Sequence, residues 1–367
     1  MFMAKKKLKI AIVFGTRPEF IKFLSVIKEL EEKGDTFFIV HTGQHYSENL
    51  DSLFFKELRL PTPQYHFNVG SLPSIEQVGL MLSKLDEIFK TERPDIVLVE
   101  GDTNSALSGA LAAVKNNIHI GHIEAGLRSG NLEMREERNR IVIDHYSSIL
   151  FAPTKNSIIN LISEGIDRKK IILTGNTVVD AAKMLKQITK KSIILEKLNL
   201  KAQKYLLVTI HRAESTERRE RLEEIVSGLN GLAIKFRYPI IFPIHPRTQN
   251  YLNKFGLKLS KKIRCVEPLG YFDFNKLLQN CLIVLTDSGG VQEEACILKV
   301  PAVTLREDTE RPETIKIGAN AITGYSAKKI ISIATKAIIA RRTWPNPFGS
   351  GGAGKKIISE IENYHYL

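Results

Sequence analysis

An apolar run, a glycine turn and a predicted helix follow one another in Leu282-Ile-Val-Leu-Thr-Asp-Ser-Gly-Gly-Val-Gln-Glu-Glu-Ala-Cys296. The unbroken apolar run 282–285 is typical of a strand that is buried on both faces of a sheet. A tight turn at 287–290 and a helix at 291–298 are predicted to follow. Paired glycines at a helix start have no side chains, so a ligand can approach the free N–H groups there. The helix dipole adds positive partial charge at the same end, and both features favour the binding of a diphosphate. One turn later, Glu294 is placed to accept hydrogen bonds from sugar hydroxyls. A Gly-Gly turn also occurs in parallel sheets for structural reasons alone, so both interpretations stay open.

The same alternation of apolar runs and helical segments extends along the chain in two series. We expect strands at 9–14, 37–41, 96–100, 118–123 and 149–152, and then at 205–210, 240–243, 263–267, 282–286 and 300–305. The main helices are expected at 19–33, 74–91, 106–114, 222–235 and 291–298. This pattern predicts an α/β fold with two doubly wound, Rossmann-like parallel-sheet domains.

The segment 180–203 is rich in Lys, Leu and Ile, has helical character and contains no strand, so we place the domain junction there. We expect an N-terminal domain at 1–182 and a C-terminal domain at 196–350. A Gly-rich link at 349–354 then leads to a final helix within 355–367, which we expect to return to the first domain. Ligands of such sheets bind beyond the carboxyl ends of the strands, so a cleft between two lobes is the expected site.

Composition limits the function classes. The chain has 367 residues, 43% of them hydrophobic and 25% charged, which is typical of a soluble globular protein. A net charge of +13 favours anionic partners, but the Lys residues are scattered and no nucleic-acid-binding signature accompanies them. The three cysteines lack CxxC spacing and lie in apolar or near-apolar runs, which predicts buried, reduced thiols and no metal site. Without a membrane-spanning run or a signal-peptide pattern, we expect a cytoplasmic protein with no membrane insertion.

Polar residues that follow the predicted strands are the candidate site residues. From the first half they are Arg17, Asp102, Glu124 and Glu136, and from the second half His211, His245, the turn Ser288-Gly289-Gly290 and Arg311. The first half therefore supplies carboxylates, and the second half supplies the phosphate-binding turn. A nucleotide diphosphate held by the second domain would present its attached group to carboxylates of the first.

Most of these residues have a structural alternative. Arg17 can pair with Glu19 near a helix start, and Asp102 can be the N-cap of the helix that follows it. Glu136 lies in the charged run 133–140, which is typical of a solvated face, and His211 can cap the end of its strand. For Glu124 the balance is different, because an unpaired buried charge costs several kcal/mol. A functional or ion-paired role is favoured there.

Eight ordered motifs support a more specific hypothesis. They are Phe14-Gly-Thr-Arg-Pro-Glu19, Thr42-Gly-Gln-His45, Gly101-Asp-Thr103, His122-Ile-Glu-Ala-Gly-Leu-Arg128, Gly175-Asn-Thr-Val-Val-Asp180, His211-Arg212, Asp287-Ser-Gly-Gly-Val-Gln-Glu-Glu-Ala295 and Thr309-Glu-Arg-Pro-Glu313. Together they closely resemble the non-hydrolysing UDP-N-acetylglucosamine 2-epimerases, from about residue 9 to the final helix. The resemblance implies a two-domain fold of the glycosyltransferase-B type and a homodimer.

The resemblance also implies roles for individual residues. Catalysis would involve Asp102, Glu124, Glu136 and His211, and UDP would be bound by Arg17, Ser288, Gly289, Gly290, Glu294 and Arg311. Gln44, His45 and His245 are similar to residues through which a second substrate molecule activates bacterial members. The chain departs from the family pattern at Glu133-Met-Arg-Glu-Glu137, where members often have Pro-Trp-Pro-Glu-Glu. No cofactor is implied, and 15–17 does not supply GxGxxG.

Three other functions remain as alternatives. A hydrolysing relative would release free N-acetylmannosamine, but its Gly-Thr-Arg-Ala start and Gly-Gly-Glu motif differ from 15–19 and 124–126 here. A glycosyltransferase of the same fold would need an acceptor, and a nucleotide-sugar sensor would leave its ligand unchanged. With UDP-N-acetylglucosamine alone, hydrolysis predicts free N-acetylmannosamine, whereas the transferase and the sensor both predict an unchanged substrate.

Overall fold

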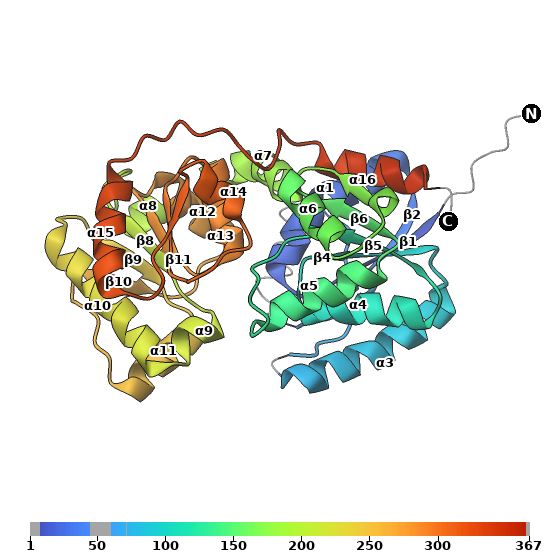
Figure 1. The fold of residues 1–367 in the computed structure, drawn as a ribbon, viewed down its shortest axis with the longest axis horizontal. Coiled ribbons are helices and arrows are strands. Elements are labelled where there is room, and N and C mark those ends of the chain that lie inside the picture. The colour runs from blue at the N-terminus through green and yellow to red at the C-terminus, as the bar shows by residue number, and fades with distance from the viewer. Residues whose placement is uncertain (1–7, 45–59, 71, 365–367) are drawn as a thin grey trace, which may run out of the picture. The chain divides into compact units, whose positions relative to one another are not determined.

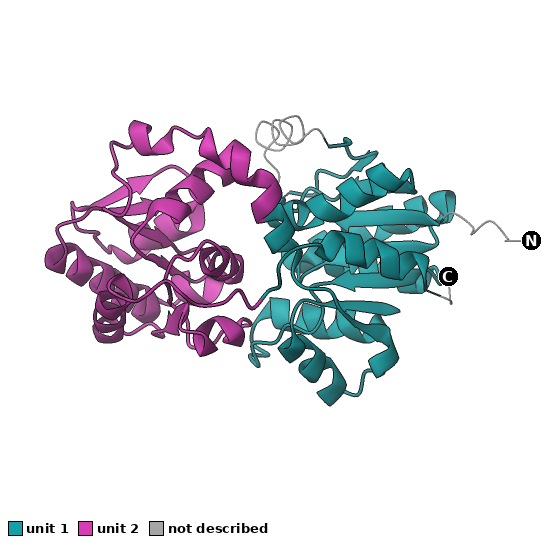
Figure 2. Cartoon of the chain, turned by 90° about the horizontal axis from the view of Figure 1, so that it is seen from above, with its two compact units in different colours: residues 1–181, 348–367 teal, residues 182–347 magenta. Residues whose placement is uncertain are grey.

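The computed structural model describes residues 8–44, 60–70 and 72–364. The chain divides into two compact units, residues 1–181 with 348–367 (unit 1) and residues 182–347 (unit 2). Figure 2 colours unit 1 teal and unit 2 magenta. Each unit contains one parallel sheet with helices packed against it (Figure 1). The predicted α/β class with two doubly wound parallel sheets is therefore confirmed.

The seven-stranded sheet of unit 1 has the order β3-β2-β1-β4-β5-β6-β7. Its strands are β1 (Lys9–Phe14), β2 (Thr36–His41), β3 (Tyr65–His66), β4 (Ile96–Glu100), β5 (His119–Ile123), β6 (Ile149–Ala152) and β7 (Ile171–Leu173). All six pairings are parallel. The chain builds outward from β1 to β3 and then resumes on the other side of β1 with β4. The carboxyl ends of β1 and β4 therefore form the topological switch point, where ligands bind in such sheets.

Helices cover both faces of this sheet. They are α1 (Arg17–Lys33), α3 (Ser74–Glu92), α4 (Asn104–Lys115), α5 (Arg135–Tyr146), α6 (Lys155–Ser163), the 3₁₀ turn η1 (Arg168–Lys170), α7 (Thr177–Lys190) and α16 (Ala353–Glu362). In Figure 1, α1, α6 and α16 lie on one face, and α3, α4 and α5 on the other. The boundary between the units falls within α7.

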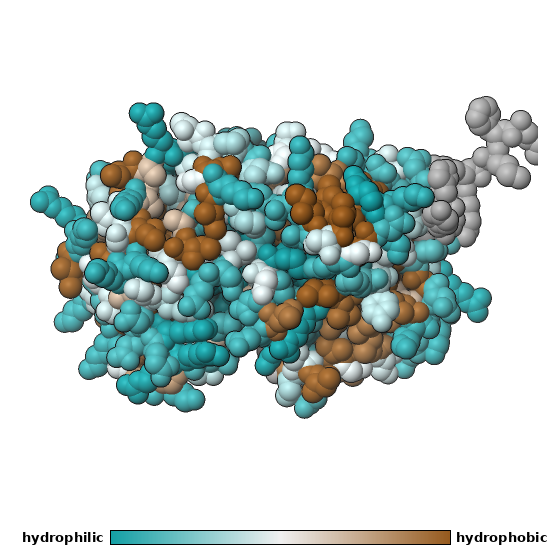
Figure 3. All heavy atoms as spheres, in the orientation of Figure 1, coloured by the Kyte–Doolittle hydropathy of each residue, from teal (hydrophilic) through white to brown (hydrophobic). Residues whose placement is uncertain are grey.

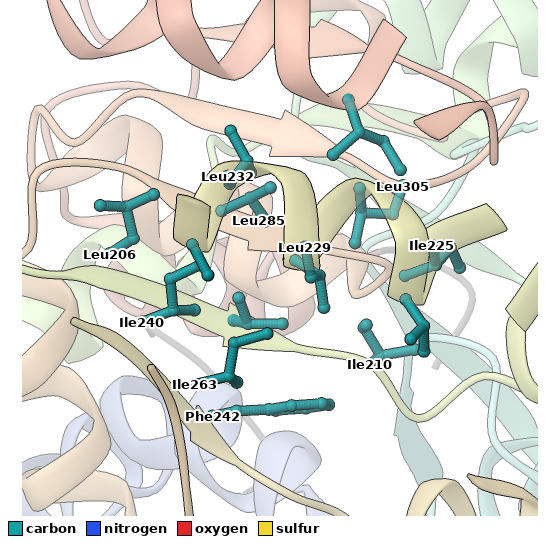
Figure 4. Close-up of a cluster of buried hydrophobic side chains, with 14 of the residues drawn as sticks. Leu206, Ile210, Ile225, Leu229, Leu232, Ile240, Phe242, Ile263, Leu285 and Leu305 are labelled. Atoms are coloured by element: carbon teal, nitrogen blue, oxygen red, sulfur yellow. The ribbon is translucent and has the colours of Figure 1, made fainter. Parts of the chain in front are cut away.

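The six-stranded sheet of unit 2 has the order β10-β9-β8-β11-β12-β13. Its elements are α8 (Ile194–Lys197), β8 (Leu206–Thr209), α9 (Ala213–Thr216), α10 (Arg219–Lys235), β9 (Ile240–Pro243), α11 (Pro246–Phe255), β10 (Ile263–Val266), α12 (Tyr271–Asn280), β11 (Val284–Thr286), α13 (Gly289–Ile297), β12 (Ala302–Thr304), α14 (Pro312–Lys316), β13 (Asn320–Ile322) and α15 (Ala327–Ile338). Here β8 and β11 form the switch point. Buried side chains of α10, including Leu229 and Leu232, pack onto Phe242 and Leu285 of the sheet (Figure 4).

The final helix, α16, belongs to unit 1 and packs on α1. Its Ile357, Ile358 and Ile361 are fully buried, and each such side chain contributes about 1.5–3 kcal/mol when it leaves water. A Cβ at Gly354 would lie 2.6 Å from the backbone of Ser25, so the two helices approach too closely for any larger residue. Asp180 accepts hydrogen bonds from the N–H groups of residues 352 and 354, at 2.5 and 3.0 Å, and fixes the start of α16.

Several expectations about single elements were wrong. The structure adds β3, β7 and β13, which are edge strands of two or three residues, and the 12-residue helix α5 within a stretch that we interpreted only as polar. α13 begins at Gly289, so both glycines are helical and do not form the turn itself. Cys265 is exposed on β10, whereas Cys281 and Cys296 are buried as predicted, and all three are free thiols.

The surface mixes residue types. Figure 3 shows hydrophilic residues interspersed with hydrophobic groups on both units. Within the described residues, no helix is both long and apolar enough to cross a membrane.

Candidate active site

The candidate residues of unit 1 follow β1, β4 and β5 at the carboxyl edge of the sheet. Arg17 is the first residue of α1, Asp102 lies in the turn after β4, and Glu124 directly follows β5. Because β4 pairs with both β1 and β5, these three turns are neighbours along the edge. The structure thus brings Arg17, Asp102 and Glu124 to one end of one sheet.

Glu19 links the first two of these turns. Its carboxylate accepts hydrogen bonds from the N–H groups of Gly15 and Thr16, at 3.1 and 2.9 Å, and from the hydroxyl of Thr103, at 2.6 Å. Burial raises the pKa of Glu19 to about 7, although these hydrogen bonds act to lower it. Glu19 therefore connects the β1 and β4 turns. From the sequence we considered it only as a partner for Arg17 and did not predict this connection.

Asp102 is held by α5. The guanidinium of Arg140 donates to Asp102 Oδ2 from Nε at 2.9 Å, and the amide of Asn139 donates to the Asp102 carbonyl at 2.8 Å. The N-cap of α4 is Thr103, whose side chain accepts a hydrogen bond from Ala106, so Asp102 does not cap that helix. The Asp102 side chain keeps 26% of its surface exposed, which leaves the carboxylate accessible to a ligand.

Glu124 is buried in a left-handed backbone conformation, with φ of 70°. Such a conformation is uncommon for a residue with a side chain and is concentrated at functional sites. The ammonium of Lys22 lies 2.6 Å from Glu124 and 2.9 Å from Glu100, which is itself buried at the end of β4. Burial raises the pKa of Glu100 well above its usual value, and the charge of Glu124 adds to this against the opposing Lys22. Lys22 is therefore the cation shared by two buried carboxylates, Glu100 and Glu124.

The loop after Glu124 is fixed by Asp144 of α5. One carboxylate oxygen accepts from the ring of His122 at 2.6 Å, and the other from Gly126 N–H at 3.1 Å and from Arg128 at 2.8 Å. Burial alone would raise the pKa of Asp144, but His122 and Arg128 outweigh it and hold that pKa below its usual range. Asp144 is therefore an ionised group under the turn that carries Glu124.

Glu136 lies in the first turn of α5 and is partly exposed. Its neighbour Glu137 is buried and accepts hydrogen bonds from the N–H groups of Ser129 and Gly130, at 2.9 and 2.8 Å, and from Arg140. The charged run at 133–140 is thus not a solvated face throughout. Glu137 orders the preceding loop, whereas Glu136 is only partly buried.

In unit 2, the turn after β8 is bonded to the turn after β11. Asp287 accepts hydrogen bonds from the N–H groups of His211 and Arg212, at 3.0 and 2.9 Å. His211 keeps 41% of its side chain exposed, and its ring centroid lies 6.0 Å from that of His245. His245 caps α11 by accepting from Arg247 N–H at 3.1 Å. His211 and the start of α13 are therefore joined at the switch point of the second sheet.

The two glycines at the start of α13 differ in the space beside their Cα atoms. A Cβ at Gly289 would lie 3.1 Å from the guanidinium of Arg311, whereas nothing lies within 4 Å of a Cβ at Gly290. Arg311 is itself buried and donates to Glu293 at 2.9 Å, so it lies beneath the helix start. Ser288 precedes the helix as its N-cap. The N–H groups around Gly290 are consequently the approachable part of this helix end.

Two further candidates have definite surroundings. Glu294 forms a hydrogen bond with the phenol of Tyr271, and burial together with Glu294 raises the pKa of that phenol well above its usual value. Gln44 accepts hydrogen bonds from the N–H and hydroxyl of Ser105, at 3.0 and 2.9 Å. His45 lies outside the described residues. Within the portion of the chain that is described, no cluster of three or more His, Cys, Asp or Glu side chains could hold a metal ion.

Comparison with known proteins identifies the family. A family model described as UDP-N-acetylglucosamine 2-epimerase matches residues 28–362. The chain belongs to this epimerase family. A UDP-N-acetylglucosamine 2-epimerase of Methanococcus maripaludis is 49% identical to it over 361 residues, which cover 96% of this chain and 98% of that protein.

Two more epimerases extend the comparison. The crystal structure of Methanocaldococcus jannaschii UDP-GlcNAc 2-epimerase in complex with UDP-GlcNAc and UDP matches with a TM-score of 0.93 and 46% identity, covering 97% of this chain and 100% of that one. A UDP-2,3-diacetamido-2,3-dideoxy-D-glucuronate 2-epimerase of Pseudomonas aeruginosa is 41% identical over 334 residues, which cover 90% of this chain and 92% of that protein. The resemblance to the epimerase family and the glycosyltransferase-B type of fold are thereby confirmed.

Several residues that support the epimerase-family site were missed from the sequence. Arg140, Glu137 and Asp144 lie on α5, and Lys22 and Glu100 lie on α1 and β4. A sequence signal was available only for Glu100. Glu100 ends the run Ile-Val-Leu-Val, where a lone carboxylate requires a partner.

Proposed function

We propose that this chain catalyses the reversible C2 epimerisation of UDP-N-acetylglucosamine to UDP-N-acetylmannosamine without hydrolysis. The observation that carries the proposal is the pair of carboxylates Asp102 and Glu124, which follow adjacent strands and are each in contact with a fixed cation. Family membership and the substrate named for the relatives support it.

The proposed reaction begins with elimination of UDP. The bond between C1 and the diphosphate oxygen breaks, and UDP leaves with the electron pair. A carboxylate removes the C2 proton, and the C–H electrons form the C1–C2 double bond of 2-acetamidoglucal. Return of a proton to the other face of C2, with re-addition of the UDP oxygen at C1, gives the manno epimer. Atoms and electrons balance without an oxidant or reductant.

Removal and return of a proton on opposite faces require two acid/base groups. Asp102 and Glu124 are the strongest candidates, because each is anchored at the carboxyl edge of the sheet with its carboxylate bonded to a neighbouring element. Glu136 is the third, since it lies in the first turn of the helix that also supplies Arg140. Glu137 is less suited, because all its observed contacts are to the protein's own backbone and Arg140.

Departing UDP requires stabilisation of the diphosphate charge. We assign this to Arg17 and His211 and to the N-terminal end of α13, at Ser288, Gly289 and Gly290. Glu294 would accept hydrogen bonds from hydroxyls of the nucleotide sugar. We assign Arg311 an indirect role, because it is buried against Glu293 and supports Gly289 from below.

The proposal is tested by incubating the protein with UDP-N-acetylglucosamine in deuterated water and following the proton NMR spectrum. UDP-N-acetylmannosamine that carries deuterium at C2 is the expected product. Free N-acetylmannosamine would indicate hydrolysis, and an unchanged spectrum would refute the proposed activity. A parallel incubation with UDP-2,3-diacetamido-2,3-dideoxy-D-glucuronate compares kcat/KM for the substrate named for the 41% identical relative.

We also propose that the chain acts as a homodimer, as the family resemblance implies. Light scattering coupled to size exclusion should then give twice the 41.4 kDa of the chain. A mass of one chain at micromolar concentration would contradict this part of the proposal.

A further inference from the structure

His122 is a fully buried histidine between two candidate catalytic turns. It is the fourth residue of β5 and lies two positions before Glu124. Its Nε2 lies 2.9 Å from the carbonyl oxygen of Gly101, the residue before Asp102, and its Nδ1 lies 2.6 Å from Asp144. We propose that His122 is a positioning residue that donates hydrogen bonds from both ring nitrogens and so fixes Asp102 and Glu124 together. This inference rests on the proposed function.

Both neighbours of the ring are acceptors. A backbone carbonyl can only accept, so Nε2 carries a proton. The carboxylate of Asp144 already receives Arg128 at 2.8 Å and Gly126 N–H at 3.1 Å on its other oxygen, and it is ionised. The proposal accordingly places a proton on Nδ1 as well, so that both ring nitrogens donate to the acceptors that face them.

With both ring nitrogens protonated, His122 and Arg128 would balance the buried carboxylate of Asp144 together with Glu164, which Arg128 contacts at 2.7 Å and whose side chain is 27% exposed. A buried charge is tolerated when it is paired and its remaining hydrogen-bonding atoms are satisfied. Hydrogen bonds from a charged donor are stronger than those between neutral groups, so the bond to Gly101 is firm.

Three side chains form hydrogen bonds with the turn after β4. His122 bonds the Gly101 carbonyl, Arg140 bonds the Asp102 carboxylate, and Asn139 bonds the Asp102 carbonyl at 2.8 Å. Asp144 is four residues after Arg140 on α5, so both side chains leave the same face of one helix. A single helix therefore orients Asp102 through its side chain and through the peptide group before it.

The β5 turn is held by the same carboxylate. Asp144 bonds Gly126 N–H, two residues after Glu124, and the Gly101 N–H donates to the Ile123 carbonyl at 3.1 Å. Glu124 adopts a positive φ, which persists only where its surroundings enforce it. His122 cannot touch a substrate because none of its surface is exposed, so its effect on the reaction passes through the two turns.

Two amide variants separate the two hydrogen bonds of the ring. An Asn amide nitrogen reaches the place of Nδ1, and a Gln amide nitrogen reaches the place of Nε2. His122→Asn therefore keeps the bond to Asp144 and loses Gly101, and His122→Gln does the reverse. We expect each to lower kcat for epimerisation about 100-fold, since a 1 Å misplacement of a reacting group costs about that much. KM and the Kd for UDP should stay within a few-fold.

His119 provides the matched control. It begins the same strand, and its Nδ1 lies 3.2 Å from the hydroxyl of Ser148, away from the candidate turns. His119→Gln should retain kcat within twofold. If His122→Asn and His122→Gln also retain kcat within threefold, the positioning role is refuted.

A spectroscopic measurement tests the wild type without any substitution. With ¹⁵N-labelled histidine at neutral pH, one imidazole should show two N–H protons that exchange slowly with solvent, because His122 is buried. His41 is also buried, with a pKa that burial lowers to about 4, and its ring signal is identified by its loss in His41→Gln. A His122 ring with a single N–H proton would overturn the proposal, even where the His122 variants fail to fold. A wild type that forms no C2-deuterated epimer would refute the proposed function, whereas an active wild type with active His122 variants would refute the positioning role alone.

Discussion

Arg140 bonds the carboxylate of Asp102 through two guanidinium nitrogens, with Nε at 2.9 Å and Nη2 at 2.7 Å from Oδ2. The same side chain is 2% exposed and also pairs with Glu137. One buried cation of α5 thus compensates two acidic groups, of which only Asp102 remains accessible. The position of the candidate catalytic carboxylate depends on a residue that the substrate does not need to reach.

Arg140→Lys should lower kcat at least 10-fold, because an ammonium cannot reproduce the two-point contact of the guanidinium fork. Arg140→Met should in addition lower the free energy of unfolding by about 3–5 kcal/mol, since it leaves buried Glu137 without its cation. Steady-state kinetics and urea unfolding measure the two effects. Arg138→Lys, at an exposed position of the same helix, is the control and should change neither quantity. An Arg140→Met protein of unchanged stability would show that Glu137 does not depend on this pair.

Glu124→Gln should abolish turnover and leave the Kd for UDP within a few-fold, because the substitution removes the acid/base group and keeps its shape. Isothermal titration with UDP and the deuterium assay provide the two readouts. The exposed Glu87→Gln on α3 serves as the control with unchanged kcat. Loss of UDP binding in Glu124→Gln would show that this residue has been wrongly assigned to the chemistry.

The paired glycines of α13 predict opposite outcomes for the same substitution. Gly289→Ala should lower the free energy of unfolding by about 1–3 kcal/mol, because its Cβ would press on Arg311 and Glu310 at 3.1 and 3.3 Å. Gly290→Ala meets no atom within 4 Å and should keep or raise stability by up to about 1 kcal/mol. If the diphosphate binds at this helix start, Gly290→Ala should still weaken UDP binding at least 10-fold. Unchanged UDP affinity in Gly290→Ala would place the diphosphate elsewhere.

Glu19 should make stability depend on pH. Burial raises its pKa from the ordinary value of 4.5 to about 7, so between these values the folded chain binds more protons than the unfolded chain. The contribution of Glu19 is therefore full below about pH 4.5 and is lost as pH rises through about 7. As pH rises through this window, the free energy of unfolding of the wild type should fall by on the order of 3 kcal/mol relative to that of Glu19→Gln.

Chemical denaturation of both proteins at several pH values measures this difference. A stability difference that rises with pH would mean that the hydrogen bonds from Thr16 and Thr103 outweigh burial and that the pKa of Glu19 is lowered. A flat difference would mean that the two effects cancel.

The central strands and their turns could be predicted from the sequence because they are buried on both faces. The expected bounds of β1, β4, β6 and β9 coincide with the observed ones. The three missed strands, β3, β7 and β13, are sheet edges of two or three residues with partly exposed side chains. Such short edges carry too few apolar residues to form a recognisable run, and proteins keep edge strands short to avoid pairing with other chains.

α5 could not be recognised by its pattern because its buried face is mostly charged. The buried residues of this helix are Glu137, Arg140, Ile143 and Asp144. A search for an apolar stripe finds only one of these four, and the others resemble a solvated surface. Their burial is stable only because Asp102, His122 and Arg128 approach from other elements, which no local pattern reveals.

The candidate carboxylates were predictable in kind, since Asp102 and Glu124 follow strands that the sequence makes clear. Their partners were not, because Lys22 lies 102 residues from Glu124 and Arg140 lies 38 residues from Asp102, both in helices of ordinary charged composition. For Arg311 the motif suggested a ligand contact, and its burial against Glu293 is a feature that the motif did not reveal.

The return of α16 to unit 1 has a consequence for biosynthesis. On the ribosome, the strands of the first sheet emerge long before the helix that covers α1 and is anchored by Asp180. The apolar side of α1 is then exposed while the whole of unit 2 is translated. Nascent chains stalled before residue 353 should therefore bind chaperones that recognise apolar surface, and release should follow once the last isoleucines have left the exit tunnel.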